Sequence, residues 1–468
     1  MLAKVGLQML RLIILARLLP AKAFGLMAIV MVIVGFVQIF GNLGLSEAII
    51  QRSDPTKEEL STLYWTNIGA GIVIFFLLLL STPLVANIYD SPEIRSLLPP
   101  VAAIFLVAPW GTQFKVLLQK SLQFRSMALI EITGELGNTL TAVFFAFLDF
   151  GIWSLVWGVL VGTMIQSALL VVCGFSSDNR PMVHFRCQDL KGYLDFGMHR
   201  VGALSLNYFN SRVDQLLVGA LLGPQMLGYY SMAFNLVIQP VQMINPVLTK
   251  VAFPVFSQIK SDIQKLRQGY LRILRILLGI NAPILVGVSV VSPVAVPLIL
   301  GDKWFPAVSV IQILAFYTMF RIIGNAGGGV ILARGRADLT FYWNLALILL
   351  IPVTVYMAGL TGKLTFIALA LLSLQVILMF ANYRFLISKV LGPCFRGYLI
   401  SIALPFGISV LMGALVFFLR KGVSQILGPW MTLLVTVGSG VFLYVLLVKL
   451  FNKDDLQEFL CFLPRFVY

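Results

Sequence analysis

Long apolar runs recur along the whole sequence, with only short polar gaps between them. An α-helix rises 1.5 Å per residue, so about 20 apolar residues are needed to cross the roughly 30 Å hydrocarbon core of a bilayer. The runs reach this length, and 59% of all residues are hydrophobic while only 11% are charged. A water-soluble core cannot bury so much apolar surface. The runs also lack the period-two alternation of barrel strands, so the sequence predicts an all-α integral membrane protein.

About fourteen transmembrane helices are predicted from these runs. Several runs exceed 25 residues, which indicates tilted or kinked helices. Pro109 and Pro283 are candidate kinks, because proline removes a backbone hydrogen bond. The predicted spans are residues 2–19, 24–50, 62–89, 97–118, 128–149, 152–174, 200–222, 227–256, 270–300, 306–333, 340–359, 363–387, 397–419 and 428–450.

The lysine and arginine residues fall mainly in the gaps on one side of the predicted membrane. If the N-terminus is inside, the gaps after even-numbered spans hold most of them. The positive-inside rule then predicts that both termini are cytoplasmic. The formal net charge of +15 is explained by this topology, so no nucleic-acid partner is expected.

The four cysteines show no CxxC pairing, and no His/Cys arrangement has metal-ligand spacing. We therefore expect neither a metal nor another cofactor. The first apolar run is not followed by a small-residue cleavage site, which favours a retained first helix over a removed signal peptide.

An internal repeat organises the spans. Residues 15–25 resemble residues 218–228, and Pro83 and Val116 fall against Pro297 and Val330 at a similar offset. Two six-helix halves of the same orientation form a parallel repeat about an axis along the membrane normal, here around a central cavity. The predicted divisions are an N-terminal bundle at 1–180, a C-terminal bundle at 181–390, and two further helices with a cytoplasmic tail at 391–468. The linker near 175–197 is expected at the cytoplasmic membrane interface.

Several short motifs resemble those of one transporter family. They are Leu15-Ala16-Arg17-Leu18-Leu19 with Phe24-Gly25, Ile49-Ile50-Gln51-Arg52, Leu63-Tyr64-Trp65 with Asn67, Arg212-Val213-Asp214-Gln215-Leu216, and Gly301-Asp302-Lys303-Trp304. Over almost its whole length the chain resembles the polysaccharide transporter family of the multidrug/oligosaccharidyl-lipid/polysaccharide superfamily. Within that family, the Wzx-type flippases, it is most similar to the colanic-acid exporter branch.

The resemblance implies a function without covalent catalysis. Such proteins alternate between inward-open and outward-open states, and they move an undecaprenyl-pyrophosphate-linked repeat unit across the bacterial inner membrane for polymerisation. The implied partners are the lipid-linked oligosaccharide, expected to be anionic, membrane lipids and the polysaccharide polymerase machinery. Relatives usually begin with some twenty further residues, so we expect the first span to be part of a longer helix.

Four basic residues within the predicted spans are candidates for binding the substrate. A charge inside hydrocarbon costs at least about 2.5–3.5 kcal/mol, so such groups usually face the interior of the bundle. Arg11, Lys115, Arg212 and Arg321 are predicted to line a hydrated cavity, since arginine binds phosphate oxygens bidentately. Alternatively, Arg212 pairs with Asp214, or Lys115 snorkels to the surface.

Glu131 and Glu135 are spaced four residues apart, on one face of a helix. Two carboxylates in lipid repel each other unless one is protonated or a cation lies between them. With Asp214 they are the candidate residues for coupling transport to H⁺ or Na⁺. The alternative is that both glutamates pair with arginines across the bundle.

Amide side chains punctuate the spans, and Gln113 and Asn245 are predicted to contact the substrate. Amides more often link helices to one another. Two other functions remain alternatives. A drug/cation antiporter would prefer acidic residues in its cavity, and a membrane glycosyltransferase would need a sizeable soluble loop with clustered acidic residues.

Overall fold

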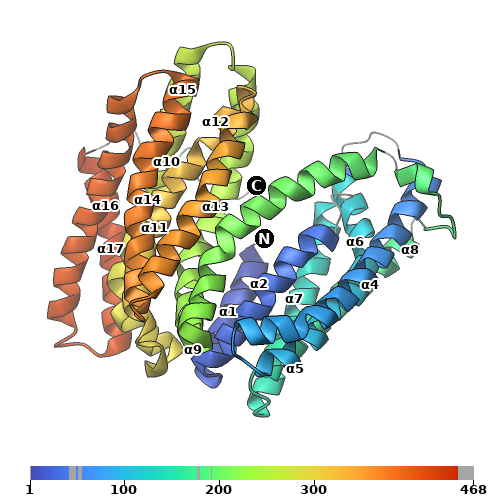
Figure 1. Ribbon diagram of the computed structural model, residues 1–468. Helices are drawn as coiled ribbons and strands as arrows, with labels where there is room; N and C mark the ends of the chain where they lie inside the picture. The colour runs from blue at the N-terminus through green and yellow to red at the C-terminus, as the bar shows by residue number, and fades with distance from the viewer. Residues whose placement is uncertain (1, 42–48, 51–54, 177–179, 191, 452–468) are drawn as a thin grey trace. The chain divides into compact units, whose positions relative to one another are not determined.

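The computed structural model describes residues 2–41, 49–50, 55–176, 180–190 and 192–451, and the predicted cytoplasmic tail beyond these ranges lies outside the described residues (Figure 1). The chain forms two compact units, Met1–Gly228 and Tyr229–Tyr468. This division follows packing, whereas the predicted divisions at 180 and 390 follow the sequence repeat and stay predictions.

The first unit is a bundle of membrane-length helices. Its elements are α1 (Leu2–Leu18), α2 (Ala21–Gly41), α4 (Lys57–Ile88), α5 (Glu93–Ala102), α6 (Ile104–Lys120), α7 (Phe124–Phe147), α8 (Trp153–Phe175), the short 3-10 helix η1 (Cys187–Leu190), and the first part of α9 (Tyr193–Gln258).

The second unit continues from α9 and is also helical. Its elements are α10 (Ile263–Leu300), η2 (Asp302–Trp304), α11 (Ala307–Ala326), α12 (Gly328–Ala333), α13 (Ala337–Gly359), α14 (Leu364–Asn382), the π-helical turn η3 (Tyr383–Ile387), α15 (Ser388–Leu391), α16 (Phe395–Val423) and α17 (Pro429–Phe451).

The predicted all-α membrane fold is confirmed, and the observed helices follow the predicted spans closely. Among the described residues, ten helical spans are long and apolar enough to cross a membrane. Helix α1 is not among these ten, since it has only 17 residues, and neither is α7, which carries Arg125, Glu131 and Glu135. Large apolar side chains on α4, such as Leu80 and Leu84, stay exposed on the isolated chain, as expected of a surface that faces lipid.

One break in the structure lies inside a predicted span, and another falls in the predicted gap between the spans at 200–222 and 227–256. The span at 97–118 consists of α5 and α6, separated at Ala103 just after Pro99 and Pro100. Helix α9 contains a non-helical residue, Gly223, with φ +81°. That conformation suits glycine, and the following Pro224 suits the first turn of a new helix, so α9 consists of two arms.

The internal repeat is visible as one packing pattern that occurs twice. In the first unit α4 packs against α6, α6 against α8, and α7 against α8. In the second unit α10 packs against α11, α11 against α14, and α13 against α14. Each helix of the second set follows its counterpart by an offset close to that of the sequence repeat. The remaining helices α16 and α17 pack against α10.

The matching segments of the repeat also cross one another within the first unit. A Cβ atom on Gly25 would lie 1.7 Å from the backbone oxygen of Pro224, and a Cβ atom on Gly228 would lie 1.9 Å from that of Ala21. Gly25 corresponds to Gly228, and Ala21 to Pro224, at the offset of the repeat. The contact is therefore reciprocal, and glycine is required at both positions because backbone approaches backbone.

Polar contacts hold the segment of residues 182–189 to α4, and we call this set of contacts the strap. Thr62 on α4 is fully buried, and its hydroxyl donates to the Asp189 carboxylate at 2.8 Å. His184 Nε2 lies 3.1 Å from the same carboxylate oxygen. The indole N–H of Trp65 donates to the Met182 carbonyl at 2.9 Å. These bonds attach the linker predicted at 175–197 to the N-terminal end of α4.

Outside the membrane spans, Asp262 caps helix α10. Its carboxylate accepts hydrogen bonds from the backbone N–H groups of Lys265 and Gln264, both at 3.0 Å. The bond from Lys265 is the largest influence, and it holds the pKa of the Asp262 carboxyl below its usual range. The cap fixes where α10 begins.

Candidate functional site

A cluster of charged side chains lies between α1, α6 and α7 of the first unit. On α1, Lys4, Gln8 and Arg11 follow one another at spacings of four and three residues, so they share one helix face. On α7, Glu131 and Glu135 share a face for the same reason. Helix α7 packs against both α1 and α6, which brings these faces together.

The contacts pair each carboxylate with basic partners. Glu131 accepts from Lys4 Nζ at 3.1 Å and lies 2.7 Å from Lys115 Nζ on α6. Glu135 lies 2.7 Å from Arg11 Nη1 and accepts from Gln8 Nε2 at 3.1 Å. Lys4, near the start of α1, pairs with Glu131, and Arg11, further along α1, pairs with Glu135, further along α7. The two helices therefore run in the same direction.

The Arg11–Glu135 pair is the most enclosed part of this charge cluster. The Glu135 side chain is 9% exposed and that of Arg11 is 22% exposed, whereas Lys115 is 39% exposed. The facing atoms Arg11 Nη1 and Glu135 Oε1 are close, but they do not align as a hydrogen bond. The pair is therefore held by charge attraction more than by hydrogen-bond direction.

The charge cluster carries a net positive charge. Lys4, Arg11 and Lys115 contribute three cations, and the two glutamates contribute two anions. Ion pairing lowers the cost of placing these groups in hydrocarbon, and one positive charge remains uncompensated within the cluster. An arrangement of this kind can attract an anionic group without leaving any single arginine or lysine unpaired.

Four of the predicted site residues thus come together: Arg11, Lys115, Glu131 and Glu135. Gln113 lies near them on α6, but its side chain is 2% exposed and donates to the Leu60 carbonyl on α4 at 3.0 Å. That bond links two helices.

Arg212 and Asp214 lie on α9. Arg212 is half-buried, and Asp214 is 4% exposed and accepts from the backbone N–H of Gln215 at 2.9 Å.

The other two predicted residues belong to the second unit. Asn245 on α9 accepts from the Asn281 side chain on α10 at 2.9 Å, which links these two helices. Arg321 lies on α11 and is half-buried. Their roles toward a substrate stay predictions.

Lys4 and Gln8 are members of the charge cluster that were not predicted. The signal was present in their spacing from Arg11, which places all three side chains on one face of the first helix. Their partners could not be identified from the sequence, because hydrophobic periodicity does not tell which faces of two membrane helices meet.

The comparison with family models gives a clear assignment. Residues 14–309, more than half of the chain, match the model described as a polysaccharide biosynthesis protein. The chain belongs to this family. The predicted resemblance to polysaccharide transporters is thereby confirmed.

Two relatives match almost the full length. The Teichuronic acid biosynthesis protein TuaB of Bacillus subtilis is 33% identical over 422 residues, which cover 89% of this chain and 86% of that protein. The Lipopolysaccharide biosynthesis protein WzxC of Escherichia coli is 32% identical over 411 residues, which cover 87% of this chain and 82% of that protein.

Solved structures show the same fold. The Lipid II flippase MurJ in an inward closed conformation matches with a TM-score of 0.79 at 14% identity, covering 97% of this chain and 98% of that one. An inward-facing multidrug resistance MATE transporter of the MOP superfamily matches with a TM-score of 0.62 at 14% identity, covering 83% of this chain and 95% of that one. The protein is thus a multi-pass membrane protein with the fold of these transporters.

Proposed function

We propose that the protein is a flippase that carries an undecaprenyl-pyrophosphate-linked polysaccharide repeat unit across the bacterial inner membrane by alternating access. The observation that carries this proposal is the combination of two near full-length similarities. Two relatives named for teichuronic acid and lipopolysaccharide biosynthesis are 33% and 32% identical in sequence to this chain. The lipid II flippase has the same fold over 97% of the chain.

The charge cluster supports an anionic headgroup as cargo. A pyrophosphate loses its hydration when it leaves water, and fixed cations can replace part of that hydration. Arg212 and Arg321 are proposed as direct ligands of the pyrophosphate. Arg11 and Lys115 act through the cluster, whose net positive charge draws the headgroup toward α1 and α6. Gln113 and Asn245 are proposed to contact the sugar chain through their remaining hydrogen-bonding capacity.

The same cluster is a candidate for coupling transport to an ion gradient. Protonation of Glu135 would free Arg11 to bind the headgroup, and loss of the proton would restore the pair. Glu131 and Asp214 are the other proposed coupling residues, with H⁺ or Na⁺ as the ion. Export that is insensitive to both gradients would remove this part of the proposal.

The remaining features of the proposal concern place and partners. Both termini are cytoplasmic, as the distribution of lysine and arginine favours. The protein carries no covalent chemistry of its own, and it delivers its cargo to the polymerase machinery on the periplasmic side.

The test is the fate of the lipid-linked intermediate in a deletion strain. If the protein is the flippase, the completed intermediate accumulates on the cytoplasmic leaflet and polymer output stops, and the wild-type protein restores both. Accumulation of incomplete intermediates would indicate a glycosyltransferase. Normal polymer output with increased sensitivity to cationic drugs would indicate an antiporter.

A further inference from the structure

A cavity of about 560 Å³ opens between α6, α7 and α8 of the first unit. Its lining comes from the end of α6, the start of α7 and the end of α8, so it lies at one end of these helices. Ligand pockets commonly measure about 300–1,000 Å³, so this cavity can hold part of a ligand. Its described lining residues are Phe114, Leu117, Leu118, Lys120, Ser121, Gln123, Ser126, Val172, Cys173, Gly174 and Ser176.

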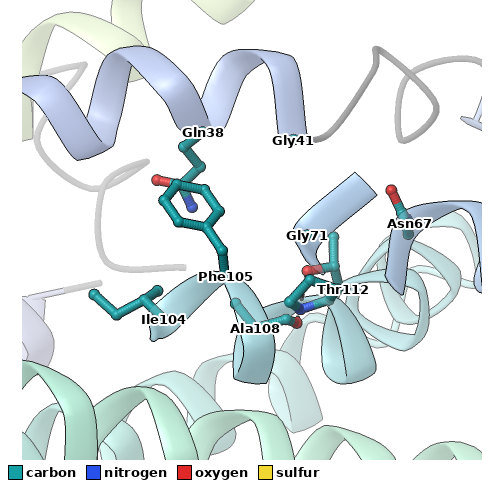
Figure 2. Close-up of a pocket in the computed structure, with 9 residues that line it drawn as sticks. Gln38, Gly41, Asn67, Gly71, Ile104, Phe105, Ala108 and Thr112 are labelled. Carbon is teal, nitrogen blue, oxygen red and sulfur yellow. Dashed lines mark hydrogen bonds between the residues drawn. The ribbon is translucent and has the colours of Figure 1, made fainter. Parts of the chain in front are cut away.

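The space between α2, α4 and α6 is much smaller (Figure 2). It measures about 30 Å³ and is lined by Gln38, Asn67 and Thr112 among others. A single water molecule needs roughly 10–15 Å³ of such space, so there is room for one or two waters. Of these two spaces, the cavity at the end of α6 is the one that can hold an organic ligand.

Part of the lining of this cavity is apolar. Leu117 and Leu118 on α6 and Val172 on α8 line it, and Val172 is 63% exposed. In the turn between α6 and α7, Leu122 and Phe124 are exposed as well. Exposed apolar side chains at the edge of a membrane helix bundle contact acyl chains. This part of the cavity therefore suits a hydrocarbon chain.

The rest of the lining is polar, and Lys120 gives it a positive charge. The Lys120 ammonium is held in place by a bond from its Nζ to the Ile49 carbonyl at 3.1 Å. The side chains of Gln123 and Ser126 make no hydrogen bond to any described residue, so both can donate to a ligand. No acidic residue is among the described lining residues. This part of the cavity therefore favours an anion.

Arg180 brings a second positive charge to the rim of the cavity. Its Nε donates to the Phe175 carbonyl at the C-terminal end of α8. Phe175 precedes the lining residue Ser176, and its ring lies 5.9 Å from that of Phe114, another lining residue. Arg180 is exposed and makes no other hydrogen bond within the described part of the chain. The rest of its guanidinium can therefore bind phosphate oxygens.

The position of the cavity matches the boundary between acyl chains and headgroups. The turn after α6 belongs to the gap after the fourth predicted span, which the positive-inside rule places on the cytoplasmic side. The cavity combines a basic, polar rim with an apolar wall, as a lipid combines a charged headgroup with hydrocarbon chains. Basic pockets between membrane helices on this side bind anionic lipid headgroups.

We infer that this cavity binds an anionic phospholipid of the cytoplasmic leaflet. Its phosphate binds Arg180 and Lys120, and the start of one acyl chain packs on Leu117, Leu118 and Val172. The cavity holds the headgroup and the adjoining part of that chain, while the rest of the lipid stays in the bilayer. This lipid is a component of the membrane and not the cargo, so the inference does not rest on the proposed function.

The test uses Cys173, whose exposed thiol lines the cavity and reports whether it is occupied. The full-length protein, with its other three cysteines replaced by serine, is purified in detergent. The rate of its reaction with N-ethylmaleimide is measured as dioleoyl phosphatidylglycerol or dioleoyl phosphatidylcholine is added. The two lipids have the same chains but differ in headgroup charge. Phosphatidylglycerol is expected to slow the reaction several-fold at a concentration where phosphatidylcholine has little effect.

Arg180→Gln tests the basic rim. It should raise the phosphatidylglycerol concentration needed for half-maximal protection about tenfold, the effect of a lost charge-assisted hydrogen bond. Arg334→Gln is the matched control, since Arg334 is also exposed and its Nη1 donates to a backbone carbonyl, that of Lys260, at 3.0 Å. Arg334 belongs to the second unit and does not line the cavity, so its variant should behave like the wild type.

Gln123→Leu tests the lining independently of Arg180. Loss of one neutral hydrogen bond should raise the same concentration about threefold. Gln119→Leu is its control, because Gln119 is exposed on the last turn of α6 but does not line the cavity. Thermal unfolding of each variant shows whether the fold is intact.

A protein that keeps only Cys187 controls for surface charge. An anionic surface attracts protons and lowers the reactive thiolate fraction of any nearby cysteine. Cys187 is exposed and does not line the cavity. Equal slowing of Cys173 and Cys187 would therefore reflect the surface charge of the micelle and would overturn the site.

The remaining outcomes are also decisive. Selective protection of Cys173 by phosphatidylglycerol, weakened in Arg180→Gln and Gln123→Leu but not in their controls, supports the site. Equal protection by phosphatidylcholine, or protection that both pocket variants retain, overturns it. Stronger protection by undecaprenyl pyrophosphate than by phosphatidylglycerol would assign the cavity to the cargo and also overturn it. Failure of the proposed flippase function would leave the lipid site standing.

Discussion

At the scale of single residues, the enclosed Arg11–Glu135 pair carries the most chemical information. Removing one member of a buried pair leaves an uncompensated charge, whereas removing both can be almost neutral. The pair therefore predicts a strong coupling between two substitutions, which a double-mutant cycle measures.

Arg11→Met is expected to lower the free energy of unfolding by about 3 kcal/mol, because it strands the Glu135 carboxylate in an enclosed site. The double variant Arg11→Met, Glu135→Leu should recover at least about 1 kcal/mol of that loss. Thermal unfolding in detergent measures both values.

The matched control is the ion pair between Lys22 and Glu93 in the same unit. Its side chains are 53% and 42% exposed, so the same cycle there should give a coupling energy below about 1 kcal/mol. Equal coupling energies in the two cycles would show that enclosure does not strengthen the Arg11–Glu135 pair.

Part of this site could be predicted from the sequence. The spacing of Glu131 and Glu135 placed both on one face, and the cost of charge in lipid singled out Arg11 and Lys115. The partners could not be assigned, because pairing depends on which helices are neighbours. The same limit applies to Gln113, whose bond to the Leu60 carbonyl depends on how α4 and α6 pack.

At the scale of elements, the strap between α4 and the linker restrains the segment that leads into α9. Its central bond joins the buried Thr62 hydroxyl to Asp189. Cys187 lies within the segment that the strap holds, and its side chain is exposed, so a thiol reagent can reach it. The rate of that reaction reports on the strap.

Thr62→Val should release the strap and speed the reaction of Cys187 with a maleimide several-fold, since it removes a hydroxyl that Asp189 uses. The assay needs a protein in which the other cysteines are replaced by serine. Thr66→Val is the control, because the Thr66 hydroxyl bonds within α4, to the Thr62 carbonyl at 2.7 Å, and to no other residue in the described ranges. Similar rates for both variants would exclude a restraining role for the strap.

The helices themselves were largely predictable, and so was the interruption at Gly223, which falls in the gap between the predicted spans 200–222 and 227–256. Apolar length alone located the spans, since lipid allows little besides helices. The break at Ala103 was not predictable, because it depends on how neighbouring helices accommodate proline, which periodicity does not report. For Gly223 the adjoining Pro224 was a usable signal of a helix start.

At the scale of the whole molecule, the distribution of positive charge predicts which side each loop occupies. Cys187 should react with a membrane-impermeant maleimide in inside-out vesicles and not in intact spheroplasts, because the linker is predicted to be cytoplasmic. Permeabilised spheroplasts provide the control for reactivity. Labelling in intact spheroplasts would reverse the predicted orientation.

The two repeated segments cross at Gly25 and Gly228, and glycine is required at both positions. Gly25→Ala should lower the free energy of unfolding by about 1–3 kcal/mol or more, because its methyl group would collide with the Pro224 backbone. Gly228→Ala should have a similar effect, since the contact is reciprocal.

Gly69→Ala on α4 is the control for this pair. A Cβ atom on Gly69 meets no atom within 4 Å, and alanine favours the helix, so its stability should be unchanged or slightly increased. Unfolding measurements on purified protein compare the three variants. Tolerance of alanine at both Gly25 and Gly228 would mean that the two backbones are not in close contact.

The crossing at Gly25 and Gly228 also has a mechanical consequence. When a helix tilts about this crossing, atoms close to the crossing move little and atoms far from it move more. Gly41 at the far end of α2 lies 16 residues beyond Gly25, roughly 24 Å away, so a tilt of about 10° at the glycines displaces that end by about 4 Å. A cysteine cross-link between the two helices beside Gly25 and Gly228 should therefore leave export intact.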